Sequence, residues 1–498
     1  MRLVCVLVLA SFGAIEGASA QETAPPATPR KEPPPAQTLK VGSVAVSILW
    51  RNRVEGWSWF GTPTSTADGD YGYLNSLVRA GVGQTKPSLD WRLEVAQPTY
   101  LGAPDDAVAP APQGALGLGP AYFGANNRKT NHATAFLKQA FVQFKQLGRS
   151  TLKVGRFEFF DGTEAAIPDP TVNGLVQSRV AHRLISNEAF PAAQRSFDGG
   201  LFTWNAGPDN VAGFAARATA GGVHLNGWKE LDIEIYYGAY NRAVKAARGA
   251  GSFRVFTVGY VDRRDAVVKP DNRPAPVRTA DRETIALATY GANYVHVFEA
   301  GKAGRFDAIG WAAAQTGSWG ALSHRAGSVF GELGWQPPEP RLRPWLRAGY
   351  RYSSGDGNPN DDRNGTFYQV FGATRQYAKF PFYNLMNLKD AYGLFAVRPN
   401  PKVTLRSEVH GLRLADRADL WYGGGGPGQS DAFGYAGRPS MGRDSLTTLW
   451  DVSADTQPTR HLGVNLYYGH ASGHDVVRGI YPNDASGHFG YVETVVRF

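Results

Sequence analysis

At residues 341–352 the chain reads RLRPWLRAGYRY, a run in which two classes of side chain alternate. One side of an extended backbone would carry four arginines, namely Arg341, Arg343, Arg347 and Arg351. The other side would carry the apolar and aromatic residues Leu342, Leu346, Ala348, Tyr350 and Tyr352. Successive side chains of a β-strand point to opposite faces, so the run predicts a strand with one polar and one apolar face.

The same period of two recurs along the chain. Four further segments carry their polar residues on one side. The first has Arg51, Arg53 and Glu55, the second Asp232 and Glu234, the third Glu332, and the fourth Thr404, Arg406, Glu408 and His410. Turn-rich stretches such as 356–360 and 423–428 separate the segments. Repeated amphipathic strands of about ten residues are typical of a transmembrane antiparallel β-barrel, and the chain length predicts about 18 strands. The carboxylates Asp232, Glu234, Glu332 and Glu408 are then expected in the lumen.

Composition excludes the main alternatives. The 498 residues contain one cysteine and 12% aromatic residues, which excludes a disulfide scaffold and a disordered chain. The mean hydropathy is −0.31, and no internal stretch approaches the roughly 20 apolar residues that a membrane-spanning helix needs. An all-β chain remains.

The start of the chain indicates export. Arg2, an apolar run over 3–15 and the sequence Ala18-Ser19-Ala20 predict a signal peptide over residues 1–20. Cys5 lies inside this segment, so the mature chain would contain no cysteine. Six prolines in the stretch that follows predict an exposed Pro-rich periplasmic tail over 21–38. The barrel is therefore expected over 39–498.

The end of the chain has the form of a closing strand. Residues 491–498 read YVETVVRF, with Val492, Thr494, Val496 and Phe498 on one side. The last strand of a barrel must pair with the first, and a terminal aromatic residue there lies in the interfacial belt. The ending also resembles the signal that the outer-membrane barrel assembly machinery reads, so we expect that machinery as a partner during biogenesis.

Three blocks resemble the alginate export family of outer-membrane barrels. They are TLKVGRFEFFDG at 151–162, RLISN at 183–187 followed by QRSFDG at 194–199, and the loop and strand at 354–368. The resemblance extends from about Val41 to Phe498. It implies an 18-stranded monomeric pore in the bacterial outer membrane, with an electropositive lumen that passes an anionic uronate polysaccharide outward.

Arginine dominates the basic residues, with 38 arginines and 14 lysines among 52. A guanidinium binds a carboxylate through two parallel donors, and rows of cations in a water-filled pore concentrate anions. The residues that we expect along an anion path are Arg156, Arg183 and Arg195 from the family-like blocks, then Arg341, Arg343, Arg347 and Arg351, then Arg51 and Arg53.

Two alternative roles for these arginines remain open. The excess could bind lipopolysaccharide phosphates at the membrane surface, or it could neutralise carboxylates inside the lumen. In particular, Arg156 and Arg195 could form internal salt bridges to Glu158, to Asp198 or to a neighbouring strand. Outer-membrane lipid and lipopolysaccharide are expected partners in either case.

The sequence gives little evidence for a metal site or for an enzyme. Asp356, Asn358 and Asn360 resemble the start of a calcium loop, but the turn glycine and the closing glutamate of that motif are missing, which favours an external turn. His470 and His474 would lie about 13 Å apart on a strand, too far to chelate one metal unless a turn brings them together. No hydrolase, zinc-protease or P-loop motif is present, so we expect no enzyme, no cofactor and no nucleic-acid partner.

These observations predict a passive outer-membrane channel for a carboxylated polysaccharide or oligosaccharide, working in export. The loops over 101–131 and 244–282 are expected to gate it. One alternative is an uptake porin for small anions or sugars. A second is a non-conducting structural or adhesive barrel. The direction of transport and the sugar are not fixed by the sequence.

Overall fold

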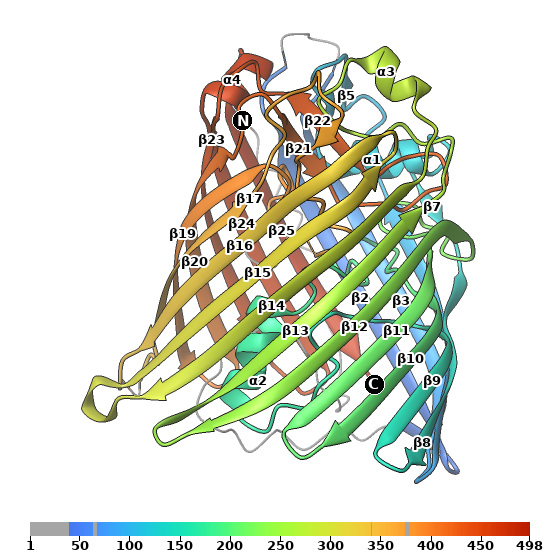
Figure 1. The fold of residues 1–498 in the computed structure, drawn as a ribbon, viewed down its shortest axis with the longest axis vertical. Coiled ribbons are helices and arrows are strands. Elements are labelled where there is room, and N and C mark those ends of the chain that lie inside the picture. The colour runs from blue at the N-terminus through green and yellow to red at the C-terminus, as the bar shows by residue number, and fades with distance from the viewer. Residues whose placement is uncertain (1–38, 63–66, 340, 374–378) are drawn as a thin grey trace.

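The computed structural model describes residues 39–62, 67–339, 341–373 and 379–498, and it is a closed antiparallel β-barrel (Figure 1). Eighteen long strands form the wall, as the sequence predicts. The predicted signal peptide and Pro-rich tail, at 1–38, lie outside the described residues. No helix in the described part of the chain is long and apolar enough to cross a membrane.

The wall strands follow one another in chain order. The first nine are β2 (Val44–Ser58), β3 (Asp70–Thr85), β4 (Leu89–Leu101), β8 (Phe136–Leu147), β9 (Ser150–Phe157), β10 (Phe197–Ala206), β11 (Asp209–Thr219), β12 (Glu230–Ala246) and β13 (Gly249–Asp262). The other nine are β14 (Ile285–Glu299), β15 (Arg305–Trp319), β16 (Leu322–Gln336), β17 (Trp345–Ser353), β19 (Leu388–Asn400), β20 (Val403–Leu414), β23 (Ser445–Thr456), β24 (Leu462–Gly473) and β25 (Ser486–Arg497).

Short elements supplement this wall. The strands β1 (Leu39–Val41), β7 (His132–Ala133) and β18 (Arg363–Asn364) extend the barrel sheet, while β5 (Val108–Ala109) with β6 (Gly114–Ala115), and β21 (Leu420–Gly424) with β22 (Tyr435–Pro439), form separate hairpins. The helices are α1 (Leu118–Ala125), α2 (Pro170–Leu175), which continues as a π-helical turn (Val176–Val180), a 3₁₀ turn (Gly301–Ala303), α3 (Ala275–Ala280) and α4 (Asp475–Ile480).

The barrel closes between its first and last long strands. β2 pairs with β25 in an antiparallel register that places Arg53 opposite Glu493. Two backbone hydrogen bonds of 2.9 and 3.0 Å between Ile48 and Phe498 complete the seam. The chain end therefore closes the barrel, as its sequence predicts.

Short turns and long loops lie at opposite ends of the barrel. Figure 1 shows α1, α3 and α4 among the long loops at one end, and tight turns joining the strands at the other. The predicted long loop over 244–282 is wrong in part, because residues 249–262 form β13. The predicted loop over 101–131 is observed, and it contains β5, β6 and α1. Short turns are typical of the periplasmic end of such barrels and long loops of the outer end.

The alternation at 341–352 is confirmed where β17 begins. Arg347 and Arg351 are buried inside the barrel, whereas Leu346 and Tyr350 are exposed on its outer surface. The prediction is wrong for Arg341 and Arg343. They precede the first residue of β17, Trp345, and lie exposed in the turn from β16. Pro344 explains the boundary, because it cannot donate a ladder hydrogen bond.

A segment between β9 and β10 folds into the barrel. This inner loop, residues 158–196, contains α2, which Asp169 caps by accepting hydrogen bonds from the N–H groups of Thr171 and Val172. Pro170 at the first helical position is compatible with that start. The inner loop buries Leu175 and Leu184 completely, and α2 contacts β13 and β14.

Where the inner loop covers the wall, the inward-facing side chains are apolar instead of polar. On β12 the apolar residues Leu231 and Ile233 point inward and are buried, while Asp232 is exposed on the outer side. The expectation that Asp232 and Glu234 line the lumen is therefore wrong, and Glu234 pairs instead with Arg263 at 2.8 Å. An apolar inner face is stable here because the inner loop removes it from water.

Candidate functional site

A cavity of about 720 Å³ remains on the other side of the lumen. It lies between the inner faces of β2, β20, β23 and β25 and the inner loop. Six cationic residues line it, namely Arg51, Arg53, Arg79, Lys379, Arg406 and Arg497. Four acidic residues line it as well, namely Glu188, Glu408, Asp451 and Glu493. Cations therefore outnumber carboxylates at the cavity.

Arg51 and Arg53 connect the seam of the barrel to the inner loop. Arg51 donates to the carbonyl oxygens of Ala189 and Pro191, the latter at 2.7 Å. Arg53 donates to the carbonyl oxygen of Phe190 at 2.7 Å, and its guanidinium lies 3.9 Å from the centre of the Phe190 ring.

Two carboxylates also bind the guanidinium of Arg53. Its Nε is 2.9 Å from Glu55 Oε1, and its Nη1 is 3.1 Å from Glu493 Oε2 on the adjoining strand. A buried guanidinium with this many partners has a fixed orientation. Arg53 therefore serves to position the inner loop at the wall of the cavity.

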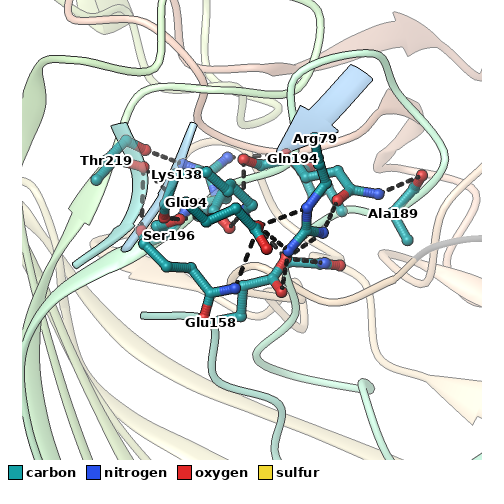
Figure 2. A network of polar contacts seen from close by, with 12 residues as sticks. Arg79, Glu94, Lys138, Glu158, Ala189, Gln194, Ser196 and Thr219 are labelled. Carbon is teal, nitrogen blue, oxygen red and sulfur yellow. Dashed lines mark hydrogen bonds and ion pairs between the residues drawn. The ribbon is translucent and has the colours of Figure 1, made fainter. Parts of the chain in front are cut away.

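A second network anchors the beginning and the end of the inner loop to the wall (Figure 2). Arg79 on β3 donates to Glu94 at 2.7 Å, to Gln194 at 2.6 Å and to both oxygens of Glu158. Lys138 on β8 reaches Glu158 at 3.0 Å and the carbonyl oxygen of Gln194 at 2.8 Å. Burial would raise the pKa of Glu158, but Arg79 and Lys138 outweigh it and hold that pKa well below its ordinary value.

The sequence matches the profile of the alginate export family over residues 105–485. The chain belongs to that family. Its matched range begins after β4, later than the span of about 41–498 over which the sequence resembles the family. No curated protein matches the sequence.

Solved structures give the fold of this family member independently. OccK2 (OpdF) of Pseudomonas aeruginosa, solved with glucuronate, matches with a TM-score of 0.54 and 10% identity over 91% of this chain and 98% of that one. OccAB2 of Acinetobacter baumannii has a TM-score of 0.54 and 9% identity over 92% and 99%. The outer membrane protein OpdK of P. aeruginosa has a TM-score of 0.52 and 10% identity over 91% and 98%.

Together, the family and the fold make this chain a channel of the bacterial outer membrane. The family and the structural neighbours are channels rather than enzymes. They favour a conducting barrel over the structural or adhesive alternative.

The arginines from the family-like blocks are engaged within the wall and the inner loop. Arg156 forms a salt bridge to Asp198, with Nε 2.7 Å from Oδ1, which is one of the alternatives left open by the sequence. Arg195 is fully buried and pairs with Glu188 at 2.8 Å. Arg183 donates to the carbonyl oxygen of a neighbouring helical turn and lies 3.7 Å from the centre of the Phe330 ring. None of these three arginines lines the cavity.

The two buried arginines of β17 also lie away from the cavity. Arg347 reaches Glu332 at 2.8 Å and also contacts Asp307. Arg351 lies 3.7 Å from Asp390. Glu332 is paired in turn with Arg179 of the inner loop at 2.9 Å. Both arginines are buried inside the barrel, where they pair with carboxylates of the wall, and Glu332 joins Arg347 to Arg179 of the inner loop.

Of the predicted path residues, only Arg51 and Arg53 line the cavity. Sequence reasoning missed Arg79, Lys379, Arg406 and Arg497 as path residues. Arg406 alternates with Leu405 on β20, so its period of two carried a usable signal. Lys379 lies in a loop, where no periodicity indicates its direction.

The candidate calcium loop is built from side-chain-capped turns. The N–H of Asn360 donates to Asn358 Oδ1 at 3.2 Å, and the N–H of Asp356 donates to Asp419 Oδ2 at 2.9 Å. Asp356 is buried, so the expected external turn is wrong at this position, and burial raises the pKa of its carboxyl to about 7. Within the described residues, no group of three or more His, Cys, Asp or Glu is placed to hold a metal ion.

Proposed function

We propose that this channel passes small carboxylate-bearing solutes, uronate-type sugars in particular, through the cavity beside the inner loop. The observation that carries the proposal is the excess of cations at the cavity, six against four carboxylates. A guanidinium pairs with a carboxylate through two donors, whereas neutral sugars gain no such pairing. The cavity volume of about 720 Å³ falls within the range of small-molecule sites.

The ligand in the solved structure of one neighbour is of the same chemical class. OccK2 was solved with glucuronate, a carboxylated sugar. The identity of 10% transfers only the fold, so the neighbour supports the choice of test ligand rather than the positions of contacts.

Export of an anionic polysaccharide is the second candidate, and membership of the alginate export family favours it. A polymer chain would have to pass the inner loop. The contacts of Glu158 with Arg79 and Lys138, and of Arg179 with Glu332, hold that loop across the lumen. Polymer export therefore requires the inner loop to leave the position that it has here.

Single-channel recording separates these candidates. Purified protein in a planar bilayer should prefer anions in a salt gradient, and glucuronate should reduce the chloride current by competing for the cavity. In liposome swelling, monomeric uronates should enter faster than oligomers of several residues. Cation preference in the wild-type channel would contradict the proposal, and faster passage of oligomers would favour polymer export.

One pair of variants on β20 makes the test specific. Arg406 lines the cavity, whereas Arg413 is exposed and pairs with Asp444 at 2.8 Å. Arg406→Glu should reduce the anion-to-cation permeability ratio several-fold, while Arg413→Glu should leave it unchanged. Equal effects of the two variants would show that the cavity cations do not set selectivity.

A further inference from the structure

Two histidines face each other across neighbouring strands on the outer surface of the barrel. His470 on β24 and His488 on β25 are directly opposed in the register. Both alternate with inward-facing neighbours, Ala471 and Phe489, which are fully buried. The two imidazole rings have centroids 4.6 Å apart, and their Nδ1 atoms are separated by 3.3 Å.

That separation suits two ligands of one tetrahedral ion. Zinc–imidazole bonds are about 2.0–2.1 Å long, and a tetrahedral angle of about 109° then places the two nitrogens about 3.3–3.4 Å apart. The observed distance between the Nδ1 atoms of His470 and His488 is within that geometry without any movement of the strands. Imidazole nitrogen is a ligand that Zn²⁺, Ni²⁺ and Cu²⁺ all accept.

The surrounding hydrogen bonds are compatible with tautomers in which both Nδ1 atoms are unprotonated. His470 Nε2 lies 3.0 Å from Ser472 Oγ; in the tautomer that carries its proton on Nε2, that proton is donated to the serine and Nδ1 carries a lone pair. Tyr468 Oη lies 2.8 Å from His488 Nδ1, and a hydroxyl that donates there likewise requires an unprotonated nitrogen. A cation bound between the two Nδ1 atoms would take the place of the Tyr468 hydroxyl proton at His488.

We propose that His470 and His488 form a surface site for a divalent transition-metal ion, zinc in the first instance. Ser472 acts as the outer partner that fixes the His470 ring, a role that metal-bound histidines commonly require. The hydroxyl of Tyr468, which bonds His488 Nδ1 in the absence of metal, gives way to the ion, and water completes the coordination. The site joins β24 to β25, the strand that closes the barrel with β2.

The site lies toward the end of the barrel that carries the long loops. His470 is three residues before the end of β24, and His488 is two residues after the start of β25. Both side chains are partly exposed, so an ion reaches them from outside without crossing the lumen. The proposal is therefore independent of what the channel conducts.

Zinc titration of the folded protein tests this proposal. The full chain, purified in detergent without a polyhistidine tag and stripped with a chelator, should bind one Zn²⁺ per chain by calorimetry. His470→Ala and His488→Ala should each weaken binding by at least about tenfold, and Ser472→Ala by about tenfold. Cobalt should give the intense visible absorption of a tetrahedral site in the wild type and not in His470→Ala or His488→Ala.

His474→Ala is the matched control, because His474 lies four residues from His470 and bonds Thr448 through Nε2 instead. It should bind zinc as the wild type does. Heat-modifiable migration on a gel verifies that each variant is a folded barrel, and His488→Gln replaces any alanine variant that fails to assemble. The proposal is overturned by unchanged zinc affinity in the His470 and His488 variants, or by no saturable binding in the wild type up to about 1 mM.

Discussion

Arg79 on β3 holds the first residue of the inner loop through two parallel bonds: Nη1 lies 3.2 Å from Glu158 Oε1, and Nη2 lies 2.9 Å from Glu158 Oε2. Both side chains are at least 86% removed from solvent. Arg79→Ala would leave Glu158 with Lys138 as its remaining cationic partner, and breaking a buried pair in this way costs about 3–5 kcal/mol. We expect a less stable barrel and a larger, noisier single-channel conductance, because the inner loop loses an anchor.

The exposed pair Arg413–Asp444 provides the control for that measurement. Its side chains are 57% and 38% exposed, and such pairs contribute about 0–1 kcal/mol. Arg413→Ala should therefore leave both urea unfolding and conductance near wild type. Identical conductance in Arg79→Ala and the wild type would show that the inner loop is held without Arg79.

The same anchor has a defined dependence on pH. Burial opposes ionisation of Glu158, but Arg79 and Lys138 prevail and lower its pKa. A carboxylate whose pKa is lowered by folding contributes stability above its unfolded pKa, about 4.3, and loses it as the pH falls through the lower folded value. The contribution of this ion pair to a stable conductance should therefore stay constant from about pH 8 to pH 5 and be lost only in stronger acid. A change in conductance near neutral pH that persists in Glu158→Gln would assign that change to another group.

Asp356 and Asp419, in the loops outside the strands, should respond to pH in the opposite direction. Burial raises the pKa of Asp356 to about 7 and that of Asp419 to about 6. An acid whose pKa is raised by folding stabilises the fold while protonated. Its contribution is complete below about pH 4, the usual unfolded value, and disappears as the pH rises through the folded value.

We therefore expect the loops over 354–373 and 415–444 to loosen between about pH 5 and pH 8. Hydrogen exchange, corrected for its intrinsic pH dependence, measures this directly. Asp356→Asn should reduce the difference in exchange rate of these loops between about pH 5 and pH 8. Asp105→Asn, in an exposed part of another loop, should leave that difference unchanged. Equal loosening in all three proteins would exclude Asp356 as its source.

The sequence predicts those parts of the fold in which a strand alternates between lipid and a polar interior. On β2, Arg51 and Arg53 face inward while Trp50 and Val54 are exposed, as the period of two indicates. The terminal strand is equally predictable, because closure of a barrel constrains both faces and the partner strand. These constraints are local in the sequence or come directly from barrel geometry.

The alternation of side chains does not predict which part of the lumen the inner loop fills and which part stays open as the cavity. Ile233 and Ile235 point inward because residues 158–196 cover them, and nothing in β12 itself reveals that cover. Arg156 and Arg347 both suit an anion path until their carboxylate partners on other wall strands, Asp198 for Arg156 and Glu332 with Asp307 for Arg347, are placed beside them. Which arginines line a cavity is thus decided by contacts between segments distant in the chain.

The outward faces of the strands determine how membrane insertion stabilises the barrel. Val329, at the centre of β16, points outward and is 48% exposed, which places it in the hydrocarbon layer. Val329→Arg should destabilise the barrel by about 2–4 kcal/mol, because a guanidinium at the bilayer midplane must be removed from water. Leu342 is similarly exposed, at 50%, but lies in the turn between β16 and β17 beside Arg341 and Arg343. Leu342→Arg should therefore cost less than about 1 kcal/mol. Urea unfolding in lipid vesicles compares the two, and equal costs would contradict the placement of β16 across the membrane.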